Sequence, residues 1–160
     1  MSFLSAVLIF VVFGVGNMFE CPEPVAVSDG WVVVEEERFS FRLPPGFRSE
    51  EVFEVDSRAG RWVKDESTVG YDYGFYSPPL DLESLPEHDF VHVCQEAESG
   101  GPKVIYYNPR GNYAVSAHWP KIQQIEDRYV KLTITATSPD QHDVSVLLAI
   151  INSVEIDGGE

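Results

Sequence analysis

Hydrophobic and polar residues alternate along much of this chain, which is the pattern of β-strands that bury one face. The alternation is clearest in residues 39–43 (FSFRL), 69–77 (VGYDYGFYS) and 129–137 (YVKLTITAT). Further strands are predicted at residues 31–34, 90–98, 103–107 and 113–119. Turn-forming sequences separate the runs, which favours hairpins and therefore an antiparallel sheet.

The last part of the chain has the period of an amphipathic helix. The apolar face of this helix consists of Val144, Leu147, Leu148 and Ile151. Ser138 is the predicted N-cap, with Pro139 as the first helical residue and Gln141 completing a capping box. Residues 47–68 are charged and have no clear period, so we expect an irregular or helical passage there. The predicted fold class is α+β, an antiparallel sheet of about six strands with helices packed on it.

The N-terminal residues predict export. Residues 3–16 (FLSAVLIFVVFGVG) are almost wholly apolar and have the length of a secretory signal core. Gly14 and Gly16 supply the small residues that cleavage after Gly16 requires. No Lys or Arg precedes this stretch, so an uncleaved N-terminal anchor is the alternative, and it is the only part expected to touch a membrane. Residues 17–30 are then a leader, and residues 31–160 a single domain.

Composition removes several classes of function. The chain of 160 residues holds 26 acidic and 11 basic side chains, a net charge of −15 that repels the phosphate backbone of nucleic acids. Most of the carboxylates lie in residues 1–98. No phosphate loop, dinucleotide fingerprint, nucleophile elbow or metalloprotease helix occurs in the sequence. We therefore predict no cofactor and no catalytic residue.

Asp72 is the candidate centre of a ligand site. On its strand it has a glycine on either side on the same face, and Tyr76 follows, so it lies in a shallow patch of exposed backbone. One hypothesis is that Asp72 accepts hydrogen bonds from a ligand, with Tyr76 as a stacking wall and Arg61 nearby. The other is structural, with Asp72 accepting hydrogen bonds from Ser57 or Arg61.

The two cysteines allow two further interpretations. On a strand, His92 and Cys94 point to the same side, and an imidazole beside a thiolate suits zinc or copper, although the spacing supplies no third or fourth ligand. Outside the cytosol, Cys21 and Cys94 could instead form a disulfide, and two free thiols remain the alternative.

A family resemblance supports the predicted fold. Residues 39–47 (FSFRLPPGF) resemble the opening of PsbP-like domains, and residues 132–136 (LTITA) with 150–154 (IINSV) are similar to their closing strand and helix. Residues 72–77 (DYGFYS) resemble a subset of exported bacterial members without a settled role. The resemblance implies a sheet with helices on its faces, an α/β/α sandwich, and a non-enzymatic accessory or binding role.

The expected function follows from these points. We expect an exported bacterial accessory protein that binds a protein partner in the cell envelope through its acidic N-terminal half or through aromatic residues exposed on the sheet. The alternative is a module that binds a small ligand or a divalent cation. An enzyme is the least expected, because no nucleophile, base and orienting group can be recognised together.

Overall fold

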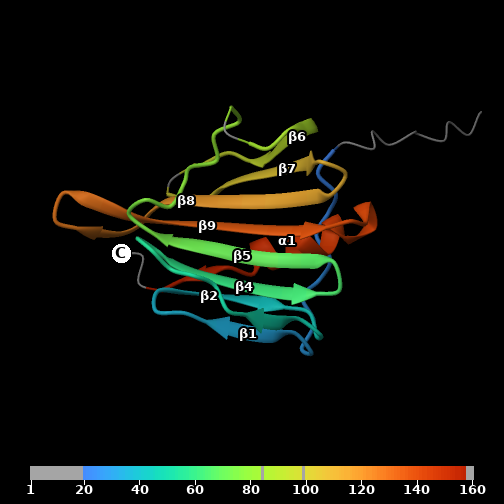
Figure 1. Cartoon of the computed structure of the whole chain (residues 1–160), viewed down its shortest axis with the longest axis horizontal. Helices are drawn as coiled ribbons and strands as arrows, with labels where there is room; N and C mark the ends of the chain where they lie inside the picture. Colours follow the sequence, from blue (N-terminus) through green and yellow to red (C-terminus); the bar gives the residue numbers. More distant parts are fainter. Residues whose placement is uncertain (1–19, 84, 99, 158–160) are drawn as a thin grey trace, which may run out of the picture.

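The computed structural model describes residues 20–83, 85–98 and 100–157. The predicted export segment, residues 1–16, lies outside this part of the chain. The described residues form a mixed α+β fold that is mostly strand, with two antiparallel sheets and one α-helix (Figure 1). The strands are β1 (Val32–Glu35), β2 (Phe39–Leu43), β3 (Arg48–Glu50), β4 (Arg58–Lys64), β5 (Ser67–Gly74), β6 (His88–Gln95), β7 (Lys103–Pro109), β8 (Tyr113–Ile125), β9 (Arg128–Ser138) and β10 (Glu155–Ile156). The helix is α1 (Val144–Asn152), which follows a short 3-10 turn at Gln141–Asp143.

The large sheet has seven strands in the order β3-β4-β5-β9-β8-β7-β6. Its longest strands, β8 and β9, have 13 and 11 residues and form the hairpin that projects at the left of Figure 1. The small sheet has the order β1-β2-β10, and its backbone pairing places Glu155 beside Ser40. The sequence predicted one sheet of about six strands, whereas the structure has two sheets, and the strands predicted at residues 31–34 and 39–43 belong to the small one.

The core lies between one face of the large sheet, α1 and the small sheet. We call this face of the large sheet the inner face and the opposite one the outer face. Phe41 of β2 packs edge-on against Trp62 of β4, with ring centroids 5.2 Å apart. Phe39 makes the same kind of contact with Tyr71, at 5.1 Å. A side chain at Gly60 would place its Cβ 2.4 Å from the Tyr71 ring, so a glycine is required there for this packing.

The C-terminal helix buries the four residues that the periodicity predicted, Val144, Leu147, Leu148 and Ile151. Its start differs from the prediction. Asp140 caps the 3-10 turn by accepting a hydrogen bond from the backbone nitrogen of His142 at 2.9 Å. The Ser138 hydroxyl accepts from the backbone nitrogen of Asp140 and donates to the Asp143 carboxylate at 2.6 Å. Ser138 thus stabilises the turn before the helix and is not its N-cap.

The expectation for residues 47–68 was wrong, because β3, β4 and the start of β5 lie there. β3 is an edge strand whose three residues are all exposed, and the side chains of β4 are exposed or half-buried. Strands of this kind are held by backbone pairing and show little apolar alternation.

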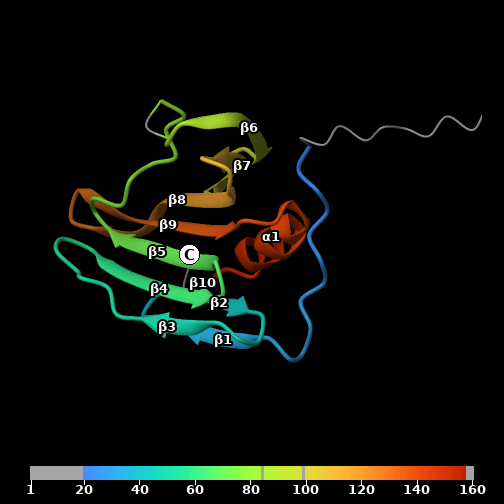
Figure 2. The same ribbon diagram turned by 45° about the vertical axis from the view of Figure 1, so that its right-hand side comes forward.

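Helices cover only one face of the large sheet in the described part of the chain. α1 lies on the inner face, which Figure 2 shows from the side. The outer face is partly covered by the loop of residues 75–87, through Leu80 and Leu85. None of the helices within the described ranges has the length and apolar character needed to span a bilayer.

Candidate functional site

The outer face of the large sheet carries a row of polar side chains that bond across the strands. The Thr68 and Thr137 hydroxyls lie 2.8 Å apart, between β5 and β9. Ser116 of β8 reaches Thr135 of β9 at 2.7 Å. These pairs satisfy each other's hydrogen bonds, so an uncharged polar surface can be buried here without a large cost.

Thr133 is the centre of this row. Its hydroxyl donates to the carbonyl oxygen of Pro78 at 2.7 Å and lies 2.8 Å from Nδ1 of His118. The Ser77 hydroxyl, 2.9 Å from that of Thr133, donates to the carbonyl oxygen of Asp72. These contacts attach the start of the 75–87 loop to the outer face.

The protons in this network can be assigned. A carbonyl oxygen only accepts, so the single hydroxyl protons of Thr133 and Ser77 are used on Pro78 and Asp72. Nδ1 of His118 must therefore carry a proton and donate it to Thr133. Burial lowers the pKa of His118, and the charge of Lys131 lowers it further, so the imidazole is neutral at pH 7.

This proton arrangement bears on the enzyme hypothesis. A serine or threonine nucleophile must give its proton to a base. Here the Thr133 proton is used on a carbonyl oxygen, and the nitrogen of His118 that faces Thr133 is a donor. The contact between Thr133 and His118 therefore supports the fold and does not have the proton arrangement of a nucleophile with its base.

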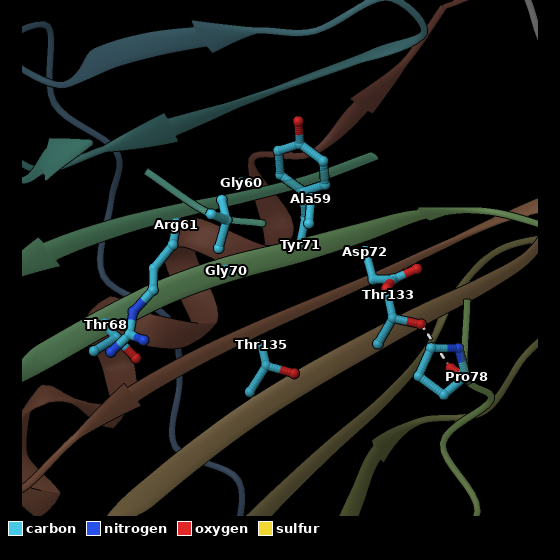
Figure 3. A pocket seen from close by; sticks show the side chains of 11 residues that line it. Ala59, Gly60, Arg61, Thr68, Gly70, Tyr71, Asp72, Pro78, Thr133 and Thr135 are labelled. Carbon is cyan, nitrogen blue, oxygen red and sulfur yellow. Dashed lines mark hydrogen bonds between the residues drawn. The ribbon is translucent and has the colours of Figure 1, made fainter. Parts of the chain in front are cut away.

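A groove of about 480 Å³ lies on the outer face over β4, β5 and β9 (Figure 3). Asp72 and Arg61, two of the three predicted ligand residues, line it. The third, Tyr76, is not among the lining residues, and its side chain is largely exposed. Tyr76 therefore does not form the predicted stacking wall, because β5 ends at Gly74 and Tyr76 no longer follows the alternation of the strand.

The Asp72 carboxylate has one oxygen in use. Its Oδ2 accepts a hydrogen bond from the Ser57 hydroxyl at 3.0 Å, as the structural hypothesis expected. Its Oδ1 is buried and has no hydrogen-bond partner among the residues that the structure describes. Arg61 pairs with Glu50 instead of Asp72, with 3.4 Å between Nε and Oε2.

Cys94 is bonded to Cys21 in a disulfide that links residues 73 positions apart. The hypothesis of a zinc or copper site at His92 and Cys94 needs a thiolate, and the bonded sulfur is not one. Within the ranges described, no three His, Cys, Asp or Glu residues group as metal ligands. The disulfide ties the N-terminal segment to β6, and Val25 bonds through its backbone to Ser145 of α1 at 3.1 Å.

A second candidate site lies where the loops gather at one end of the large sheet. Large apolar side chains are exposed there, with fractions of 92% for Phe53, 78% for Val55, 70% for Tyr76 and 43% for Ile125. We call these four residues the apolar end. Val55 and Ile125 line one depression although they are 70 positions apart in the sequence. The alternation of acidic and apolar residues at 51–56 (EVFEVD) is the sequence signal for this surface, but so short a run does not show whether its apolar side chains are buried.

Comparison of the sequence with protein-family models and with curated proteins finds no match in either. The class of protein that the described residues define is a mixed α+β domain of two antiparallel sheets and one helix. Its two candidate sites are the groove at Asp72 and the apolar end.

Proposed function

We propose that this protein is an exported, non-catalytic accessory domain that binds a protein partner in the cell envelope through its apolar end. The observation that carries the proposal is the exposure of Phe53, Val55 and Tyr76 in neighbouring loops of one described domain. Large aromatic and aliphatic side chains that remain in water are costly, and contiguous ones are typical of interaction surfaces. Aromatic residues also supply much of the binding energy at such surfaces.

Charge indicates what kind of partner fits. Residues 50–56 hold four carboxylates and no basic side chain. Two nearby arginines are engaged, Arg58 with Glu37 and Arg128 over the Phe75 ring at 4.2 Å. The apolar end therefore has an acidic surround, which favours a partner segment with basic and apolar residues.

Export and the PsbP-like class belong to the same proposal. The Cys21–Cys94 disulfide supports an oxidising compartment, where such bonds persist. The apolar run at residues 3–16 is the proposed signal or anchor. The antiparallel sheet with a C-terminal helix on it is in keeping with a PsbP-like domain. The proposal includes a second helical layer, which would make the fold an α/β/α sandwich.

Site-specific photocrosslinking in producing cells tests the proposed interface. A photoreactive phenylalanine analogue replaces Phe53 in the full chain, and the matched control carries it at Val33, which is also exposed but lies on β1. We expect a discrete crosslinked protein from position 53 that position 33 does not give. Replacing Glu51, Glu54 and Asp56 by their amides should reduce the yield, because the charge that attracts a basic partner is removed. Equal products from both positions, or none from position 53, would contradict the proposal.

A further inference from the structure

We propose that the outer-face groove is a second binding site, for a short extended zwitterion such as a peptide of three or four residues. The amino group of the ligand lies at Asp72 and its carboxylate at Arg61. This site is distinct from the apolar end, since none of the four residues of the apolar end lines the groove. Four features of the groove lead to the assignment.

The first feature is the open floor at Gly70. The missing side chain of Gly60 is explained by the aromatic rings that occupy its place in the core. No such explanation holds for Gly70, because a Cβ there would meet only the backbone oxygen of Gly60, at an ordinary 3.4 Å. Gly70 pairs with Arg61 on one side and Thr135 on the other, so it lies in the middle of the groove. A glycine in this position leaves bare backbone against which an extended ligand can lie.

The second feature is the carboxylate of Asp72. A carboxylate offers about four acceptor positions, and the Ser57 hydroxyl fills one of them. The buried Oδ1 has no donor, so the loss of its hydration is uncompensated. An ammonium group carries three donors and a charge of opposite sign. Asp72 lines the groove, so an ammonium group bound there lies beside this carboxylate.

The chemistry around Asp72 favours an organic cation over a metal ion. Calcium takes about six to eight oxygen ligands, several of them carboxylates. Asp72 is the one carboxylate among the described residues that line the groove, and the other oxygen-bearing side chains there are those of Tyr71 and three threonines. An ammonium group needs only one carboxylate and nearby acceptors.

The third feature is Arg61. Its side chain is half-exposed, and in Figure 3 it points along the groove away from Asp72, toward the end lined by Thr68. The ion pair with Glu50 uses Nε, so the two terminal nitrogens remain for a carboxylate in the paired geometry that guanidinium groups favour.

The fourth feature is length. Thr68 and Asp72 are four residues apart on β5, which corresponds to about 13 Å at the rise of a strand. An extended peptide of three or four residues spans about 10–14 Å. The opposite charges at the two ends of the groove thus match the opposite charges at the ends of such a peptide.

Titration of the full chain with tetraglycine, followed by amide NMR shifts, tests the proposal. We expect saturable shifts at Gly70 and Thr135. N-acetylated tetraglycine, which lacks the ammonium group, should bind at least about tenfold more weakly, since a charged hydrogen bond is lost. Tetraglycine amide should lose affinity through Arg61 in the same way.

Substitutions test whether tetraglycine binds in this groove or at another negatively charged surface. Asp72→Asn should weaken tetraglycine binding by at least about tenfold, and Gly70→Val should abolish binding by filling the floor. Asp65→Asn is the control, because it removes the same charge from a turn outside the groove. A cooperative melt for each variant shows that it folds. Phe53→Ser should leave tetraglycine binding unchanged, so failure of the proposed interface and failure of this site are distinguishable.

Two results would overturn the proposal. One is the absence of saturable shifts in the folded wild-type chain. The other is equal affinity for tetraglycine and its N-acetylated form, or for the wild type and Asp72→Asn.

Discussion

The two faces of the large sheet are built from the same strands and differ in almost every other respect. On β9, Leu132, Ile134 and Ala136 point to the inner face and are fully buried among apolar side chains. Thr133, Thr135 and Thr137 alternate with them and point to the outer face, where the first two bond to β8 and Thr137 bonds to β5. The inner face is closed by α1 and the small sheet, whereas a single loop covers part of the outer face.

The difference between the two faces shows that the inner face serves to stabilise the fold. Apolar packing on the inner face needs only shape and volume, so it leaves no group available for recognition. The outer face retains hydroxyls, an imidazole and a carboxylate, and a buried polar face of this kind must satisfy each hydrogen bond or lose stability. Function is therefore expected on the outer face and in the loops beside it. Substitutions on the two faces test that division.

The largest effect is expected from the covalent link at the edge of the inner face. Replacing Cys21 and Cys94 by serine opens a loop of 73 residues and should lower the unfolding free energy by about 4 kcal/mol in the chain-entropy model. Urea denaturation of the oxidised wild type and the double variant measures this. The wild type under reducing conditions is the control and should resemble the variant.

Ile134→Ala on the inner face should lower the unfolding free energy by about 3 kcal/mol, because Ile134 is fully buried and its loss leaves a cavity. Ile134→Val removes one methylene and should cost about 1 kcal/mol. Denaturant titration of both variants gives the comparison. A cost below about 1 kcal/mol for Ile134→Ala would mean that the inner face is loosely packed.

Thr133→Val on the outer face should cost about 2 kcal/mol, since the Pro78 carbonyl and Nδ1–H of His118 lose their partner while remaining buried. The matched control is the double variant Thr68→Val/Thr137→Val, in which both members of a pair become apolar together. That control should be nearly neutral. Equal costs for the two would contradict the assignment of Thr133 as the centre of the network.

His118 should make stability depend on pH. Its pKa in the folded chain is lowered from the ordinary value of 6.5, first by burial and then by Lys131. As the pH falls through about 6.5, the unfolded chain therefore takes up this proton before the folded chain does. The contribution of His118 to stability is intact above that pH and decreases as the pH falls toward the lowered pKa.

Denaturation of the wild type and His118→Asn between about pH 8 and pH 5 isolates this effect, because the carboxylates titrate alike in both proteins. Asparagine keeps a donor near the position of Nδ1 and does not titrate. The wild type should lose more stability toward acid than the variant does. Parallel pH profiles would show that His118 is not held neutral by its surroundings.

The smallest effect on stability is expected at the apolar end. Phe53→Ser should change the unfolding free energy by less than about 0.5 kcal/mol, since the ring is 92% exposed. Phe41→Ser, at a fully buried ring, is the contrasting control and should be severely destabilising. A large loss for Phe53→Ser in a melting experiment would place that ring in the core and remove it from the proposed interface.

The sequence predicted the parts of this molecule that depend on regular burial. The periods at residues 39–43 and 129–137 identified β2 and β9, and the apolar stripe of α1 was also recognised, because a buried face imposes a period on neighbouring residues. β3 and β4 were missed: β3 is an exposed edge strand, and the side chains of β4 are exposed or half-buried, so neither strand shows that period. Asp72 was recognised as a polar residue between glycines, but its groove was not.

The sequence alone therefore predicts the mixed α+β class, the apolar inner face and the acidic charge. The pairing of distant residues follows from the tertiary structure: His118 contacts Thr133 across a hairpin, Val55 and Ile125 line one depression at the end of the sheet, and Cys21 is bonded to Cys94 through 73 positions of chain. The physical reason is the distance along the chain between the residues that interact. Burial on one face of a strand is a local property that leaves a period in the sequence, whereas a contact between distant segments depends on strand order and register, which no local pattern encodes.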